Sequence, residues 1–196
     1  MSERLGDLSP LERDLVNAAA EGDVLECSQL PIEQLSATDD PKHTVRAELL
    51  RELLLKRCDK PPDPRGVRLH RARITGTLDL THVRAEIGMD LVGCTFDHPV
   101  LMKGAHLPWL ALTGSSVPAL HGDLLQVNGD LSLDEGFRAT GHGEVGAVRL
   151  LGARITGELS LSGAELTHQA GLRQSHVIMA GCCGDTPRVA FSRPGW

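Results

Sequence analysis

The chain has very few aromatic residues. Its 196 residues include no tyrosine, two tryptophans and three phenylalanines, although apolar residues make up 41% of the sequence. The core must therefore be built from leucine, valine, isoleucine and alanine. An aliphatic core in a chain with 21 glycines suggests small layers that repeat.

The chain also lacks a basic excess, long apolar runs and a cysteine framework. Its net charge of -6 and pI near 5.8 argue against binding of nucleic acid. The charged start MSERLGDLSPLERD contains no apolar signal region, and no run of about 18 apolar residues follows, so we expect a cytoplasmic protein. The cysteines form no C-x-x-C motif, which predicts free thiols without a metal site. They are Cys27, Cys58, Cys94, Cys182 and Cys183.

Two amphipathic helices are predicted in the first third of the chain. For residues 10–21, Ser9 is a good N-cap, Glu12 completes a capping box and Gly22 supplies a left-handed stop. After a polar, proline-containing stretch, residues 44–57 carry leucines at helical spacing with basic residues at the end. We expect this second helix to cover the apolar end of the region that follows; the alternative is a helix that lies on a membrane surface.

From residue 67 the sequence consists of short alternating apolar phrases separated by glycines. Five phrases read as strands, at residues 76–80, 88–93, 110–114, 129–133 and 157–161. The segment VRLHRARITGTLDLT at 67–81 returns as VRLLGARITGELSLS at 148–162, with ten of fifteen positions identical. Short strands that recur must stack to bury their apolar sides, which predicts a β-solenoid. At about 20 residues per coil the offset between the two copies predicts roughly four coils, within a range of three to five.

The repeated phrases carry a resemblance to a known family. In ARITGTLDL and LLGARITGELSLSGAEL a small alanine stands two residues before a central isoleucine or leucine, as in a degenerate pentapeptide repeat. The pairs are Ala72 and Ile74, Ala153 and Ile155, and Ala164 and Leu166. With the preceding RAELLRELLL, residues 9–166 resemble actinobacterial pentapeptide-repeat-like proteins, some of which carry the labels oxidoreductase or membrane protein. The resemblance implies a right-handed quadrilateral β-helix and no particular catalytic residue.

These patterns divide the chain into three parts and predict a mainly β fold. Residues 1–66 are a helical N-terminal cap segment with a proline-rich linker, and residues 67–166 are a short right-handed β-helix. Residues 167–196 lose the strand phrases and turn basic, which favours an irregular or disordered tail. The alternatives for this tail are a terminal cap and the product of a truncated or frameshifted reading frame.

The hexapeptide GHGEVG at 141–146 matches the dinucleotide-binding pattern G-x-G-x-x-G. In that motif a strand leads to the first glycine and a helix begins at the third, so that its N-terminal amides face the pyrophosphate. Strand-like alternation stands where the helix should begin, which favours a loop between two strands. As an alternative, Gly141, Gly143 and Gly146 bind the cofactor of an NAD(P)-dependent oxidoreductase.

Two further groups of residues are candidate sites. A solenoid aligns distant positions, and His82, His106 and His121 would then share an outer face, although solvent-exposed positions are favoured over a metal site. An acidic row would resemble the duplex mimicry of gyrase-binding pentapeptide-repeat proteins. Its members are Asp79, Asp90, Asp130 and Asp134. The repeat region holds eleven acidic residues against eight basic ones, so its face is only mildly acidic.

The function that the sequence favours is a non-enzymatic interaction or structural module. We expect its flat faces to bind another protein or, end to end, a second copy of the chain. Candidate contact residues are Arg73, Asp79, Trp109 and Arg154, and for Trp109 a packing role is an equal alternative. No catalytic residue, cofactor or metal is predicted. The alternatives are the oxidoreductase and a peripheral membrane module.

Overall fold

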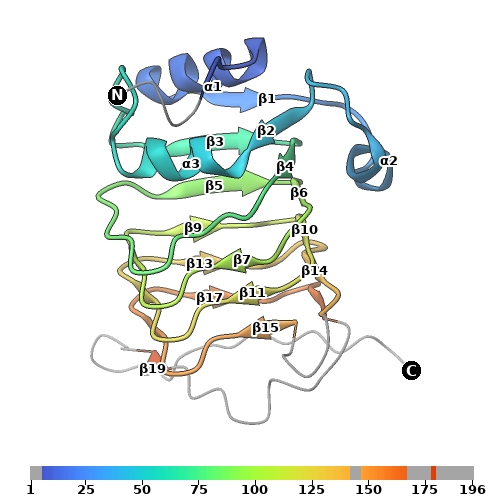
Figure 1. Cartoon of the computed structure of the whole chain (residues 1–196). Coiled ribbons are helices and arrows are strands. Elements are labelled where there is room, and N and C mark those ends of the chain that lie inside the picture. The colour runs from blue at the N-terminus through green and yellow to red at the C-terminus, as the bar shows by residue number, and fades with distance from the viewer. Residues whose placement is uncertain (1–5, 142–146, 167–177, 180–196) are drawn as a thin grey trace.

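A computed structural model describes residues 6–141, 147–166 and 178–179. In these residues the protein is predominantly β, with short parallel strands in four sheets and helices near the N-terminus (Figure 1). Sheet A consists of β1 (Val24–Glu26), β3 (Val67–His70), β5 (Met89–Val92), β9 (Leu110–Ala111), β13 (Leu131–Ser132) and β17 (Leu159–Ser160). Sheet B consists of β2 (Thr44–Arg46), β4 (Arg73–Thr75), β6 (Thr95–Phe96), β10 (Ser116–Val117), β14 (Arg138–Ala139) and β18 (Glu165–Leu166).

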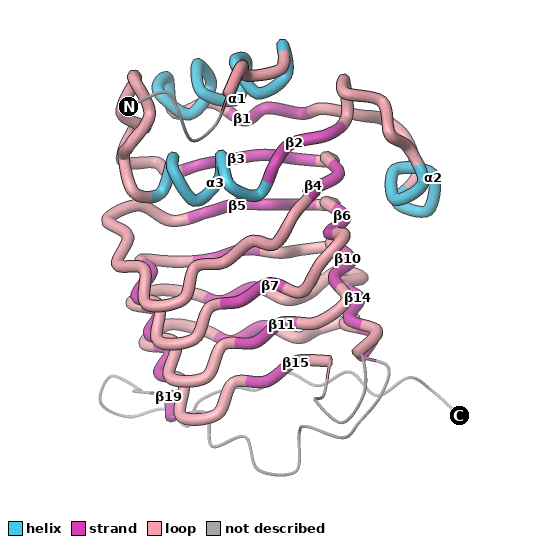
Figure 2. Tube along the Cα trace, viewed as in Figure 1, coloured by secondary structure: helices cyan, strands magenta, loops and turns pink. Residues whose placement is uncertain are grey.

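The other two sheets are smaller. Sheet C consists of β7 (Val100–Leu101), β11 (Leu120–His121) and β15 (Val148–Arg149). Sheet D consists of β8 (His106–Leu107), β12 (Gln126–Val127), β16 (Arg154–Ile155) and β19 (Ile178–Met179). From β5 to β18 the chain visits sheets A, B, C and D in turn and then returns to sheet A (Figure 2). Each pass therefore adds one strand to every sheet.

The register of sheet A shows how regular the passes are. Met89 pairs with Leu110, and Leu110 pairs with Leu131, so two successive passes have the same length. The next pass, from Leu131 to its partner Leu159, is longer, because the chain between β14 and β15 is longer than the link between β10 and β11. Side chains alternate inward and outward along each strand. The inward residues of all four sheets belong to one hydrophobic cluster, so the sheets enclose a single aliphatic core.

The structure corrects the interpretation of the duplicated segment. Val67 lies in β3 of sheet A, whereas its counterpart Val148 lies in β15 of sheet C. The two copies therefore do not lie a whole number of passes apart. Every short strand needs the same alternation of one inward apolar and one outward polar side chain, so the same phrase fits any sheet. Of the five predicted strand phrases, 76–80 forms only an isolated bridge between Asp79 and Leu101, and the other four contain strands of sheet A.

The N-terminal helix α1 (Pro10–Glu21) is confirmed. Ser9 and Glu12 form the capping box, and Gly22 ends the helix at φ 72°. The second predicted helix is wrong at both ends: residues 44–46 form β2, which pairs with β4, and α3 spans only Ala47–Leu54. Helices α1 and α3 lie over the N-terminal end of the sheets (Figure 1), and the apolar side of α3 is buried. Strand β1 pairs with β3 and extends sheet A, and β2 pairs with β4 and extends sheet B. The N-terminal region therefore contributes strands to the sheets and does not only cover their end.

The polar stretch after β1 contains a further helix, α2 (Ile32–Ala37). Figure 1 shows α2 beside β4 and β6 of sheet B. Its Leu35 is fully buried, and the side chain of Thr95 on β6 is covered as well. Residues 28–43, which we call the arm, therefore occupy part of the outer face of sheet B.

Candidate interaction surfaces

The outer face of sheet B is neutralised by the arm. Arg73 lies 2.6 Å from Asp39 of the arm and 2.8 Å from Asp97, and Arg138 lies 2.9 Å from Glu33. Arg73 also donates a hydrogen bond to the carbonyl of Thr38 at 2.6 Å. An acidic segment of this chain thus contacts the arginines of this sheet face through single arginine–carboxylate bonds. The pair with two parallel hydrogen bonds, the stronger geometry, is that between Arg73 and Asp97.

Sheet A carries charged side chains on its first strands and small side chains on its later ones. Near the N-terminal end, Asp90 lies 3.7 Å from Arg68 and 3.4 Å from His70. Further along the sheet, Ala111, Ser132 and Ser160 follow in register, and this part of the face is flat.

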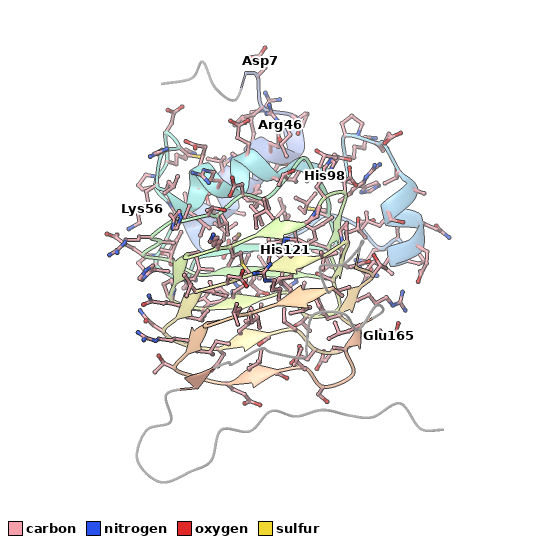
Figure 3. The ribbon with its side chains drawn as sticks, turned by 60° about the horizontal axis from the view of Figure 1, so that its bottom comes forward. Asp7, Arg46, Lys56, His98, His121 and Glu165 are labelled. Carbon is pink, nitrogen blue, oxygen red and sulfur yellow. The ribbon has the colours of Figure 1, made fainter. Side chains whose placement is uncertain are left out.

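Sheet C carries His121 and Arg149 in register on neighbouring strands (Figure 3 labels His121). Arg149 forms an ion pair with Asp123 at 2.7 Å. The Nε2 atom of His121 is buried and has no hydrogen-bond partner among the described residues. At the edge of this sheet Leu124 and Leu151 are exposed to 57% and 44%.

Sheet D carries an uncompensated basic row. Arg84 pairs with His106 through an isolated bridge, and Gln126 pairs with His106 on one side and Arg154 on the other. These four residues, the sheet D row, face outward, because buried residues precede and follow each of the three on β8, β12 and β16. Arg84 and Arg154 are exposed, and within the described residues neither guanidinium has an ion pair or a hydrogen bond.

The four candidate contact residues do not form one surface. Arg73 lies in sheet B, Asp79 forms a bridge to β7 of sheet C, and Arg154 lies in sheet D. Trp109 immediately precedes β9 of sheet A, and a Cβ atom on Gly88 would overlap its indole ring. Since the indole packs on this glycine, the structure favours the packing role for Trp109.

Asp79 lines an open cavity of about 490 Å³ together with Arg46, Arg51 and Thr75. Arg51 donates a hydrogen bond to the carbonyl of Asp79, and Arg46 is held by Glu12 at 2.7 Å. The pKa of Asp79 lies below its ordinary value chiefly because its carboxylate accepts hydrogen bonds from Thr81. The cavity is thus lined by charges of both signs, since the exposed Glu48 borders it as well.

The glycine motif is described only at its first residue. Gly141 is buried, has a φ of 65° and donates its amide to the carbonyl of Pro118 at 2.8 Å. Gly143 and Gly146 lie outside the described residues. The strand β15 begins at Val148, where a dinucleotide-binding unit would continue its helix. The segment that contains the motif therefore joins a strand of sheet B to a strand of sheet C.

The described cysteines are not activated as thiolates, and the described residues offer no metal site. Burial raises the pKa of Cys27 and Cys94 to about 12 and that of Cys58 to about 11. No group of three or more metal-ligating side chains occurs in the part of the chain that the structure describes. Cys182 and Cys183 lie outside that part.

The histidine and aspartate alignments that the sequence suggested do not form. His106 lies in sheet D and His121 in sheet C, while His82 is in the turn before Arg84. Asp79 bridges to sheet C, whereas Asp90 lies in sheet A, so the aspartates do not form a single acidic row.

Sequence reasoning missed Arg84 and Gln126 as surface residues, although it named Arg154. Their signal was the recurrence of outward polar positions, one on each pass, from Arg84 through His106 and Gln126 to Arg154. The intervals between these positions are unequal, which hides the recurrence until the strand register is known.

The fold and its surfaces define a predominantly β protein made of short parallel strands in stacked sheets. Comparison with known proteins found no matching family model, no similar curated protein and no similar solved structure. Among the described residues, no helix is long and apolar enough to cross a membrane.

Proposed function

We propose that the four sheets form a right-handed β-helix of the pentapeptide-repeat type. Strands β6, β7, β8 and β9 begin at residues 95, 100, 106 and 110, so each side of a pass takes close to five residues, which supports this proposal. The repeated ARITG phrases and RAELLRELLL support assignment to the actinobacterial pentapeptide-repeat-like group, and the charged start without a long apolar run supports a cytoplasmic location.

The proposed function is non-enzymatic binding of another protein through a flat outer face. The observation that carries it is the sheet D row, where two exposed guanidinium groups lack partners among the described residues. Two cations that this chain does not neutralise can complement a negatively charged surface of a partner. A second copy of the chain is an alternative partner. Because α1 and α3 cover the N-terminal end, an end-to-end contact would use the opposite end.

The position of α3 argues against the peripheral membrane alternative. Its apolar side belongs to the hydrophobic core. The buried residues are Ala47, Leu49, Leu50, Leu53 and Leu54. A helix that binds a lipid surface must present such a side to the bilayer.

A calorimetric titration with NAD(P) and NAD(P)H tests the proposal against the oxidoreductase alternative. We expect no saturable heat up to low millimolar cofactor, because a strand follows the glycine motif where the phosphate-binding helix would be. Saturable binding that a bulky residue at Gly143 abolishes, with the fold intact, would overturn the proposal and favour the enzyme.

A further inference from the structure

The sheet D row has a fixed geometry. Its members lie on adjacent parallel strands in direct register, and such strands are about 4.8 Å apart. Arg84 and Arg154 are three strand spacings apart, which is roughly 14 Å. His106 and Gln126 lie between them and add an imidazole and an amide. Backbone hydrogen bonds between the strands fix this spacing, because the amides of His106, Gln126 and Arg154 each donate to a carbonyl of the preceding pass.

The charged side chains on sheet D itself are positive, and acidic residues lie at its borders. Asp130 and Glu158 are exposed four residues after Gln126 and Arg154, where the chain turns into sheet A. Glu86 follows Arg84 by two residues and is paired with Lys56 at 2.6 Å, while Asp123 on the adjoining turn is paired with Arg149. Lys103 adds an exposed positive charge before β8. The row is thus a local basic surface on a protein with a net charge of -6.

Sheet B shows what such a surface binds in this protein. There Arg73 pairs with Asp39 of the arm and with Asp97, and Arg138 pairs with Glu33 of the arm and with Glu165. Sheet D carries arginines in the same outward positions, and no acidic arm covers them within residues 6–141 and 147–166. The ranges that the structure does not describe contain three acidic residues, Glu3, Glu144 and Asp185, which are too far apart in the sequence to form an acidic segment. A complementary acidic segment would therefore come from another molecule.

We propose that the sheet D row binds an acidic, extended segment of a partner protein, with carboxylates on Arg84 and Arg154. This proposal rests on the proposed function and names the face and the chemistry of the partner. An extended chain advances about 3.3 Å per residue, so carboxylates on residues i and i+4 are about 13 Å apart, close to the spacing of the two arginines. Residue i+2 points to the same side and lies over His106 and Gln126.

The test is fluorescence anisotropy of a labelled ten-residue peptide of alternating glutamate and serine, titrated with the full chain in about 50 mM salt. We expect saturable binding that weakens at least about tenfold in Arg84→Glu/Arg154→Glu, because each carboxylate loses its cation. The matched control, Arg13→Glu/Lys42→Glu, makes the same change in net charge at exposed sites elsewhere and should retain binding. A glutamine–serine peptide should not bind. Thermal unfolding verifies that both variants are folded.

Two results would overturn this proposal: no binding of the glutamate peptide at about 1 mM, or an equal loss in both double variants, which would show a general charge effect. Failure of the proposed protein-binding function is distinguished by cross-linking from the other faces. If a partner cross-links through Ser132 of sheet A or Leu101 of sheet C while the peptide does not bind, protein binding stands and the sheet D assignment is wrong. If no face cross-links, the proposed function itself fails.

Discussion

Replacement of Glu12 by alanine is expected to lower the free energy of unfolding by about 2–3 kcal/mol, because it removes a buried carboxylate that accepts hydrogen bonds from Arg46 and from the start of α1. Glu12 is 2% exposed and accepts hydrogen bonds from the Nε and backbone amide of Arg46 at 2.8 and 3.1 Å. It also accepts from the amide of Ser9 at 2.9 Å. The carboxylate thus joins the start of α1 to the junction of β2 and α3, and urea unfolding measures the loss.

The control is Asp14→Ala, which removes an exposed carboxylate from the same helix and should change the free energy of unfolding by less than about 0.5 kcal/mol. Equal effects of the two substitutions would contradict the role assigned to Glu12.

The same carboxylate makes stability depend on pH. Burial tends to raise the pKa of Glu12, but the hydrogen bonds from Arg46 and from the amides of Ser9 and Arg46 outweigh it and hold the pKa below its ordinary value. The stabilisation is therefore present above the pKa of the unfolded state and is lost as the pH falls through the lowered folded-state pKa. Glu12→Gln should flatten this acid limb of the stability profile. If the loss of stability at low pH is unchanged in Glu12→Gln, other carboxyl groups cause it.

Replacement of Leu53 by alanine is expected to cost about 2–5 kcal/mol and to leave a single unfolding transition. Leu53 on α3 is fully buried in the same cluster that contains the inward residues of the sheets. Its truncation creates a cavity at the covered end of the sheets, so the whole unit should lose stability together. Denaturant unfolding followed by circular dichroism and tryptophan fluorescence measures both the cost and the number of transitions.

Leu124→Ala is the matched control, because Leu124 is 57% exposed and should cost little. Two separate transitions in Leu53→Ala would show that residues 1–66 fold apart from the sheets, as the sequence-based division suggests.

Local signals made part of the fold predictable. The capping box of α1 depends on neighbouring residues, and the four correct strand phrases all belong to sheet A, where alternation is most regular. Most strands are only two residues long, but in sheet A the alternation continues beyond the strand with a second buried leucine, as in Leu131 and Leu133. The strands of sheets B, C and D lack such a leucine pair. Residues 44–46 look helical because leucines follow them, yet Thr44 and Val45 are β-branched and pair with β4.

The candidate surface was harder to predict than the core. Arg154 was singled out from its phrase, but its neighbours Gln126 and Arg84 lie one and three passes earlier in the chain. Only the strand register brings them together, and the longer link after β14 changes the interval between passes. Arg73 was also named from the sequence, but it forms an ion pair with Asp39 of the arm. No local sequence pattern predicts this contact, because the two residues are far apart in the chain.

Face-directed photo-cross-linking tests most directly the claim that this protein works by binding another protein through an outer face. A benzophenone amino acid is placed at Gln126 of sheet D, Ser132 of sheet A, Leu101 of sheet C and, as a control, Asp59 in the turn after α3. We predict one discrete cross-linked partner from Gln126, which the glutamate–serine peptide displaces and Arg84→Glu/Arg154→Glu abolishes. No cross-link from any of the three faces, together with saturable NAD(P) binding, would contradict the account.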